Sequence, residues 1–355
     1  MLKDLHVLST VRQPYDDFTA IPELPTGVHL PEDYTDSMTI FGWDRNALVK
    51  NLELYHNKDK KTMEAVYALQ YTADNILEQP IYDVTNKSIL IEGADPRYYM
   101  SFAEQWWKMG NSYVRKHNVN PDVYENAPNA KHLRLTMEHI GWLGMAWYFT
   151  KNPEYSRRAA EKIHLWFLDP VKSMYPNMKY AHIIPGTQIG SPQGVLEMLA
   201  VIELFNGVAL ISNSDQWSKK YDNQLKHWLN EYLLWLENDS APIEERKSID
   251  HHGTWFDAQI MSIYGYLERP IDAARIAYFG RQRLDYQVSE RTMMYEIVDG
   301  QGLEHVQRNL EGWVSIAEMA GPLGIDVWNY GMFEGHSFKT VFDSFKPYWL
   351  SLGLT

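Results

Sequence analysis

Apolar residues recur every three or four positions through most of the chain from about Ala47 onward, and short stretches rich in Pro, Gly and Asn separate the periodic segments. This spacing places the apolar side chains along one face of an α-helix. No run of alternating apolar and polar residues indicates a strand. The pattern predicts helices over residues 61–77, 98–109, 131–149, 154–167, 194–211, 215–236, 254–267, 271–279, 309–321 and 337–350.

The connections between these predicted helices are short, so successive helices are expected to pack antiparallel. Such hairpins close most simply into a bundle, a solenoid or an α/α ring, and no fixed-period repeat in the sequence separates these three. Proline breaks the pattern at Pro25, Pro31 and Pro80. Residues 1–46 are therefore expected to form an extended, loop-rich arm. No linker rich in Gly or Ser divides the chain, so we expect one domain over residues 1–355.

The composition excludes several kinds of chemistry. The sequence contains no cysteine, which rules out disulfides, thiolate metal sites and cysteine nucleophiles. Any metal ligands must therefore be histidine or carboxylate side chains. The formal net charge of −13 argues against nucleic acid as a partner, because proteins that bind it usually carry a basic excess. No apolar run without a charge or a turn residue approaches the roughly 20 residues that span a bilayer, so no membrane partner is predicted.

Aromatic residues make up 14% of the chain, with 13 Trp and 23 Tyr. Their rings offer flat apolar faces with a polar edge, which suits stacking on sugar rings. The same side chains also fill the cores of large helical proteins. For any single aromatic residue, the sequence leaves both roles open.

Four stretches combine aromatic, acidic and amide residues in a distinctive order. The first is 93–101 (Gly-Ala-Asp-Pro-Arg-Tyr-Tyr-Met-Ser) with Trp106-Trp107, and the second is 119–122 (Val-Asn-Pro-Asp). The third is 166–170 (Trp-Phe-Leu-Asp-Pro) with 180–181 (Tyr-Ala) and 184–186 (Ile-Pro-Gly), and the fourth is 250–257 (Asp-His-His-Gly-Thr-Trp-Phe-Asp). Together with 324–328 (Gly-Ile-Asp-Val-Trp), they resemble segments of the alginate lyase family over roughly residues 85–330. The resemblance implies an all-α fold, an incomplete (α/α)n toroid built from antiparallel helical hairpins.

The resemblance also implies a function, which is cleavage of a uronic-acid-containing polysaccharide such as alginate or glucuronan by β-elimination. In such lyases an Asn neutralises the uronate carboxylate, a His or Tyr removes the C5 proton, and a Tyr protonates the leaving oxygen. A proton beside a carboxylate is too weakly acidic for a side-chain base until positioned donors stabilise the developing enolate. His252 matches the family histidine and is the residue expected to abstract the proton.

Three positions depart from the family pattern, and each departure introduces a histidine. His251 stands where the family has the neutralising Asn, and it is expected to support the carboxylate by donating from its ring. His305 falls where the family has its catalytic Tyr, and Tyr295, ten residues upstream, is the alternative proton donor. His182 replaces a position that is commonly Gln in the family.

The substrate groove is expected to present aromatic rings and a cation to the acidic sugar chain. Arg308 can clamp a carboxylate through two parallel hydrogen bonds, or it can pair with Glu304 or Glu311 on its own helix surface. The two residues of the Trp pair are expected to separate, one ring entering the core and one facing the groove. The predicted substrate-binding residues are Tyr98, Tyr99, Trp106, Trp107, Tyr180, His182, Trp255 and Arg308.

The histidines raise the alternative of a metal site. No cofactor is required by the lyase chemistry, but His182, His251, His252 and His305 can together bind a divalent metal such as zinc. The metal would neutralise the uronate carboxylate or activate a water for hydrolysis. Adjacent residues of a helix point about 100° apart, which argues against both His251 and His252 binding one ion. Taken alone, His182 and His305 are better explained as structural histidines of the groove or core than as catalytic residues.

Acidic residues suggest further roles and an alternative function. Asp257 and Gln259 are expected to orient a histidine from behind. Residues 244–247 (Glu-Glu-Arg-Lys) are predicted to form a solvated loop. A glycoside hydrolase on the same toroid, with a carboxylate pair, is the chief rival function, and a glycan-binding protein with altered catalytic residues is the third. The carboxylates that the hydrolase reading offers are Glu197, Asp250, Asp257 and Glu304.

The start of the chain carries no visible targeting segment, because Lys3, Asp4 and His6 interrupt the apolar stretch that a secretion signal needs. We expect a secreted or periplasmic protein, with a cytoplasmic one as the alternative. The sequence predicts no particular oligomeric state.

Overall fold

The computed structural model describes residues 22–31, 41, 43–88, 90–116, 120–121, 127–288, 302–332 and 335–351. The prediction of an all-α fold is confirmed. The α-helices are α1 (Arg45–His56), α2 (Lys60–Leu77), α4 (Asn129–Thr150), α5 (Pro153–Ile163), α6 (Val201–Ile211), α7 (Lys219–Asn238), α8 (Ser240–Arg246), α9 (His251–Tyr266), α10 (Pro270–Gly280), α11 (Leu284–Gln287), α13 (Leu303–Ala320) and α14 (Phe338–Ser351). Shorter turns are η5 (His164–Leu168), η6 (Pro192–Met198), η7 (Arg281–Arg283) and η8 (Gly321–Leu323).

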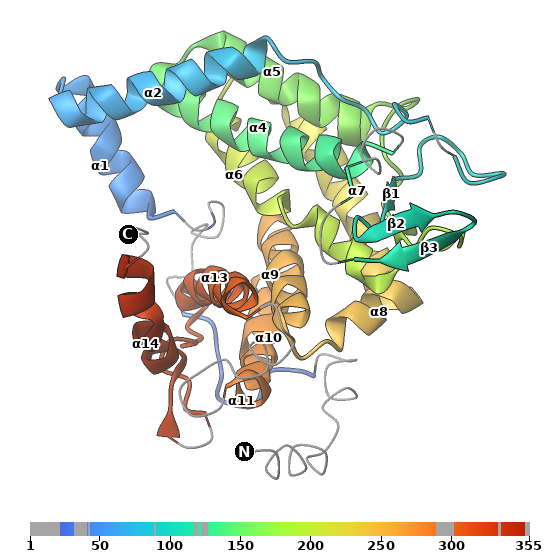
Figure 1. Ribbon diagram of the computed structural model, residues 1–355. Helices are drawn as coiled ribbons and strands as arrows, with labels where there is room; N and C mark the ends of the chain where they lie inside the picture. Colours follow the sequence, from blue (N-terminus) through green and yellow to red (C-terminus); the bar gives the residue numbers. More distant parts are fainter. Residues whose placement is uncertain are drawn as a thin grey trace.

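Neighbouring helices pack in an arc, as expected for an incomplete α/α toroid (Figure 1). Helix α4 packs against α2, α5 and α6, and α9 packs against α6, α10 and α13. One buried apolar cluster runs through these helices, with Trp166 and Trp313 among its largest fully buried side chains. Burial of such large apolar surfaces is the main stabilising term of the fold.

Several helices begin where a short polar side chain accepts hydrogen bonds from the otherwise unpaired N–H groups of the first turn. Pro153, the first residue of α5, fits the same position because its missing N–H is not needed there. The capping residues are Asp44 (α1), Asp59 (α2), Asn152 (α5), Ser218 (α7), Asp239 (α8) and Asp250 (α9).

The predicted helix over 98–109 is wrong, because this segment forms strands. Strand β1 (Met100–Phe102) pairs in parallel with β4 (Tyr180–Ile183), and β2 (Trp106–Met109) pairs antiparallel with β3 (Ser112–Arg115). Gly110, with φ of 63°, and the following Asn form the two-residue turn between β2 and β3. A Gly/Asn turn between two four-residue runs is a hairpin signal, and it outweighed the helical spacing.

Other predicted boundaries also change. Helices α1 and α8 were not among those predicted, and α13 begins six residues before the predicted start at residue 309. The longer α13 brings His305 and Arg308 onto the helix. Segment 154–167 ends in the π-helical turn η5, and 215–236 begins only after its cap Ser218.

One segment of the described chain, Pro192–Ile211, is long and apolar enough to cross a membrane by length and composition, although it carries charges within that length. Glu197 and Glu203 interrupt it, which is why the sequence pattern did not single it out. In the structure 61% of the apolar window is buried within the protein, as η6 followed by α6 packed on α4. The segment is therefore explained as a core element.

Candidate active site

The start of α9 is fixed by close contacts with the preceding loop. Asp250 Oδ1 accepts hydrogen bonds from the His252 N–H at 2.9 Å and from Ser248 Oγ at 2.5 Å. A Cβ atom on Gly253 would lie 2.0 Å from the Ser248 carbonyl oxygen, which only glycine avoids. The glycine of the His-His-Gly motif thus lets the loop approach the helix.

A buried arginine holds the same loop from behind. Arg283 is fully buried and contacts Asp257 Oδ2 at 3.0 Å, the Arg246 carbonyl oxygen at 3.3 Å and the Ser248 carbonyl oxygen. Asp257 therefore pairs with Arg283, and within the described residues it makes no hydrogen bond to a histidine. The predicted partner role of Gln259 is likewise wrong, since its buried side-chain amide has no hydrogen bond within the described residues.

A hydrogen-bond network joins α9 to α13. Gln287 Nε2 donates to Thr254 Oγ1 at 2.9 Å, and Thr254 Oγ1 donates to Asn309 Oδ1 at 2.8 Å. Trp313 Nε1 donates to Gln287 Oε1 at 2.7 Å. These buried bonds fix the relative position of the two helices, because leaving any of these groups unpaired would be costly. They set the place of His305, one turn before Asn309 on α13.

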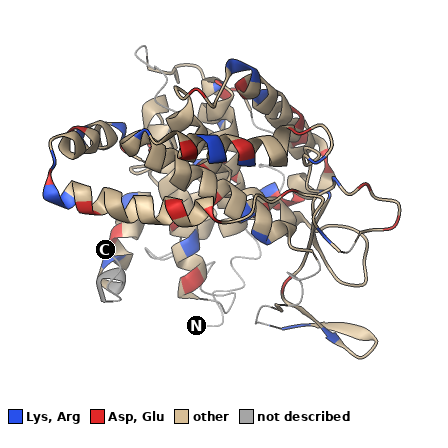
Figure 2. Ribbon diagram, turned by 90° about the horizontal axis from the view of Figure 1, so that it is seen from above, with Lys and Arg blue, Asp and Glu red and all other residues tan. Residues whose placement is uncertain are grey.

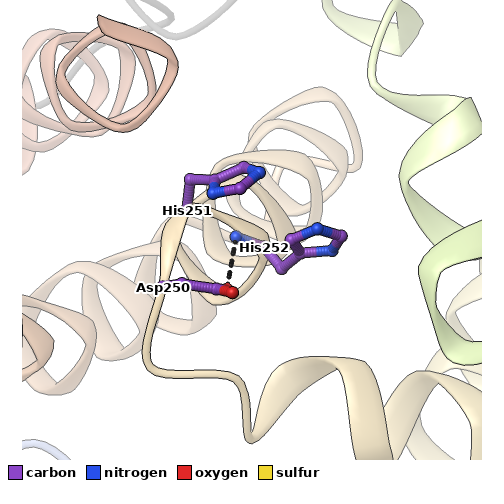
Figure 3. A group of neighbouring side chains, drawn as sticks. All are labelled: Asp250, His251 and His252. Atoms are coloured by element: carbon purple, nitrogen blue, oxygen red, sulfur yellow. Dashed lines mark hydrogen bonds between the residues drawn. The ribbon is translucent and has the colours of Figure 1, made fainter. Parts of the chain in front are cut away.

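Three histidines lie in contact at this junction. The ring centroid of His251 is 4.5 Å from that of His252 and 4.5 Å from that of His305. His251 is buried and the other two are half-buried. Figure 3 shows His251 and His252 side by side at the first turn of α9, with Asp250 beneath them. Although their side chains leave the helix in different directions, the two rings are neighbours.

Glu245 lies behind His252 and was missed by the sequence analysis. Its carboxyl oxygen Oε1 is 2.5 Å from His252 Nδ1, and the side chain is 4% exposed. The prediction that residues 244–247 form a solvated loop is wrong, because 244–246 belong to α8 and place Glu245 on its buried face. Glu244 and Glu245 point in different directions because they are adjacent on a helix. The sequence shows only a run of charged residues, so the difference between the two is not visible there.

His182 reaches the cluster from a strand bulge. Met100 pairs with Tyr180 and Phe102 with Ile183, so β4 holds one residue more than β1 between these pairs. His182 has φ of 52°, a left-handed conformation that costs free energy outside glycine, and its N–H donates to Ser101 Oγ at 2.7 Å.

Electrostatics make His182 a neutral ring. Burial, with nearby His252 and Arg115, lowers the pKa of His182 to about 4. Its Nδ1 lies 2.7 Å from Ser191 Oγ. At neutral pH His182 is therefore a hydrogen-bonding group without charge, in electrostatic contact with His252.

Glu197 forms a second polar centre next to β1. Tyr99 O–H donates to Glu197 Oε2, and Ser101 O–H donates to Oε1 at 2.9 Å. Burial raises the pKa of Glu197 to about 7, against the opposing effect of these hydrogen bonds. Tyr99 is only 1% exposed, so the prediction that it lines the groove is wrong; its ring lies in the core.

A substitution of Glu197 tests this assignment. The folded-state pKa lies above the ordinary value of 4.5, so the folded wild type loses stability as pH rises from about 4.5 through 7. Glu197→Gln removes this dependence. Relative to the wild type, the variant should gain about 1 to 3 kcal/mol in free energy of unfolding between pH 4.5 and pH 8, allowing for partial exposure. Urea denaturation at both pH values measures it, and an equal difference at both would contradict the raised pKa.

A cavity of about 1300 Å³ lies beside these groups. Of the residues predicted to bind substrate, Trp255 lines it, and Trp255 Nε1 donates to the Arg308 carbonyl oxygen at 2.8 Å. Among the described residues the wall includes Glu197 but none of the four histidines. Trp255 is one turn after His251 on α9, so it joins the cavity to the cluster. Other aromatic lining residues are Phe41, Trp43, Phe102 and Trp142.

The remaining predicted binding residues lie apart from this wall. Tyr98 and Tyr180 are half-buried, with ring centroids 5.3 Å apart. Trp106 and Trp107 are both half-buried on β2, so the expected split between core and groove is wrong; it assumed a helix.

Two predicted site residues remain, Arg308 and Tyr295. Arg308 is exposed and lies 3.7 Å from Glu304 one turn earlier, which is the surface pairing that the sequence allowed. Tyr295 lies outside the described residues.

The metal alternative has partial geometric support. Ligand atoms of Asp250, His251 and His252 lie within 4.8 Å of one another. The argument that adjacent histidines point too far apart to share an ion is therefore weakened. Asp250, however, already accepts two hydrogen bonds as the cap of α9. His305 is not part of this group, although its ring centroid lies 4.5 Å from that of His251.

The site of this all-helical protein combines a buried glutamate with a half-buried histidine, an arrangement that suits proton transfer. Comparison with known proteins identifies the family. A family model for alginate lyase matches residues 53–351, most of the chain, and the protein therefore belongs to the alginate lyase family. No match was found among curated protein sequences.

Solved structures share the fold. An alginate lyase from Bacteroides ovatus superposes with a TM-score of 0.82 at 24% identity, covering 88% of this chain and 83% of that one. A histidine-to-alanine variant of alginate lyase A1-III, a protein of a Sphingomonas species, superposes with a TM-score of 0.53 at 14% identity, covering 90% and 80%. Another variant of that protein, complexed with a tetrasaccharide, has a TM-score of 0.51 at 15% identity, covering 91% and 79%.

Proposed function

We propose that this protein is a polysaccharide lyase that cleaves a uronate-containing glycan by β-elimination, with His252 as the base. The observation that carries the proposal is the contact between His252 Nδ1 and the buried Glu245. Membership of the alginate lyase family and the tetrasaccharide complex of a structural relative support an acidic sugar chain as substrate.

Glu245 determines which ring nitrogen reacts. An ionised carboxylate can only accept a hydrogen bond, so His252 Nδ1 keeps its proton and donates a hydrogen bond to Glu245. In the neutral ring the lone pair is then on Nε2. This nitrogen takes the C5 proton of the uronate, and Glu245 stabilises the imidazolium that forms.

The electron pair left on C5 must be stabilised before the bond to the leaving group breaks. His251, whose ring contacts those of both His252 and His305, supplies a ring N–H donor for the uronate carboxylate. Arg115, the cation that acts on His182, adds positive charge nearby. The electron pair on C5 then forms the C4–C5 double bond, and the bond from C4 to the leaving oxygen breaks.

The leaving oxygen takes a proton. His305 is one ring away from His251, and Glu197 holds a proton up to about pH 7 at the cavity wall. Tyr295 remains the sequence-based candidate. His305 is the proposed proton donor to the leaving oxygen, because it lies in the histidine cluster itself.

The test is the ultraviolet absorbance of the unsaturated product during incubation with alginate, glucuronan, pectate and glycosaminoglycans, each with and without a chelator. A rise in absorbance on any of them supports the proposal. Release of reducing ends without absorbance would instead establish a hydrolase, and the loss of activity with chelator would assign the histidines to a metal. Silence in both assays would favour a binding protein.

A conservative change in Glu245 tests its positioning role. Glu245→Gln should lower kcat by roughly 10- to 1000-fold with little change in KM, since the amide no longer selects the reactive tautomer of His252. The matched control is Glu244→Gln, which alters the exposed neighbour paired with Lys247 at 3.7 Å. Initial rates by product absorbance and melting temperatures are measured for both. Equal rates in the two variants would contradict the role of Glu245.

A further inference from the structure

A second cavity, of about 590 Å³, lies at the other end of α9 from the histidines. His251 is the first residue of α9, and Tyr266, its last, lines this cavity. The fifteen steps from the first residue to the last rise about 1.5 Å each, so the helix separates the two places by roughly 22 Å. The cavity is thus remote from the proposed active site.

The charge of this cavity is opposite to that of the protein. Its lining includes two carboxylates, Asp222 and Glu268, and both contact one cation, Lys226, at 3.3 and 2.5 Å. The other lining cations have no ion pair recorded within the described part of the chain. They are Arg45, Lys151 and Lys219. Three cations at one cavity, on a chain of net charge −13, make this place locally attractive to an anion.

Lys151 is exposed, but its amine packs against two aromatic rings. It ends α4 with φ of 55°, and its amine lies 3.8 Å from the centre of the Trp147 ring and 5.3 Å from that of Tyr148. Burial lowers the pKa of Lys151. An amine that has already lost part of its hydration binds an incoming anion at a smaller further cost.

The cavity also carries groups that suit a sugar. The rings of Trp147, Tyr148 and Trp217 lie in its wall, and Ser212 and Asn213 bring a hydroxyl and an amide. Lys219 begins α7, a 20-residue helix whose positive end adds to the field. Cationic and aromatic side chains therefore line the same cavity, and they come from several parts of the chain.

The first cavity is its electrostatic opposite. Its wall holds two cations, Lys131 and Arg134, and Arg134 already pairs with Glu138 at 2.9 Å. Both signs are otherwise interspersed over the helices (Figure 2). The carboxylates of that wall are Glu104, Glu138, Glu197, Glu203 and Glu318.

We propose that the second cavity is an accessory binding site for an anionic oligosaccharide segment. Its cations bind carboxylates of the sugar chain, and the half-buried ring of Tyr148 packs against a sugar face. A polymer held there is kept near the protein while another part of it enters the active site, which raises the effective concentration of cleavable chain.

The experiment counts bound oligosaccharides by isothermal titration calorimetry. His252→Ala serves as the background so that the ligand, a tetrasaccharide of mannuronate or of glucuronate, is not consumed. The test variant adds Arg45→Gln and Lys219→Gln. The control adds Lys50→Gln and Lys220→Gln, which remove the same number of charges from α1 and α7 outside the cavity. Inorganic sulfate is titrated in parallel.

The background and the control should each bind at two sites, and the test variant should lose at least about tenfold in affinity at one of them. Identical isotherms for test and control would overturn the proposal. So would sulfate binding that the tetrasaccharide fails to displace, because the cavity would then be a simple anion site. Binding is counted without turnover, so a protein that shows no lyase activity is a separate result from one that lacks this site.

Discussion

Replacing His252 by alanine is expected to lower the rate of product formation by about 10²- to 10⁴-fold, the usual contribution of a positioned general base. The substitution removes the ring that contacts Glu245 and keeps the backbone N–H that bonds to Asp250. The fold should therefore persist. Initial rates by absorbance and circular dichroism measure the two properties.

The control for this variant is His227→Ala. His227 is an exposed histidine on α7 that lies 3.6 Å from Glu231, far along the chain from the cluster. It should keep full activity. A His252→Ala protein that retains its rate would remove the proposed base and leave the fold without an assigned chemistry.

The largest effect on stability is expected from Arg283→Met. The guanidinium is fully buried, and its loss leaves the Asp257 carboxylate buried without its charged partner and releases two loop carbonyls. Breaking one side of a buried pair typically costs about 3 to 5 kcal/mol. Urea denaturation should show a loss of this size, and lyase activity should fall with it, because the same arginine holds the loop that leads into His251.

Two further variants distinguish the effect of breaking the buried ion pair from the effect of removing any arginine. Arg269→Met removes a surface partner of Asp272 at 2.7 Å and should cost less than about 1 kcal/mol. Arg283→Met combined with Asp257→Leu should recover part of the loss, since no unpaired charge remains. Equal losses for the buried and the surface arginine would show that burial of the pair has no special role.

The fold was predictable because long periodic helices dominate it. The hairpin of β2 and β3 was not, since each strand is four residues long and its Trp-Trp pair also fits a helix. The Gly-Asn turn at residues 110 and 111 was the available signal.

The candidate site was predictable only in part. His251, His252 and His305 were named from sequence, and the structure brings their rings together. Glu245 was not, because only the helical path of α8 places one member of an acidic pair inside and the other outside. The pairing of Asp257 with Arg283, 26 residues away, is equally invisible without the fold.

Helix α9 also sets a length scale. Its first turn carries the proposed base and its last residue lines the basic cavity, and a packed helix does not shorten or stretch. The helix therefore keeps a constant distance between the histidine cluster and the second cavity. A glycan shorter than this span cannot touch both at once, so any advantage of the distal cavity should set in abruptly above a threshold number of sugars rather than grow gradually with chain length.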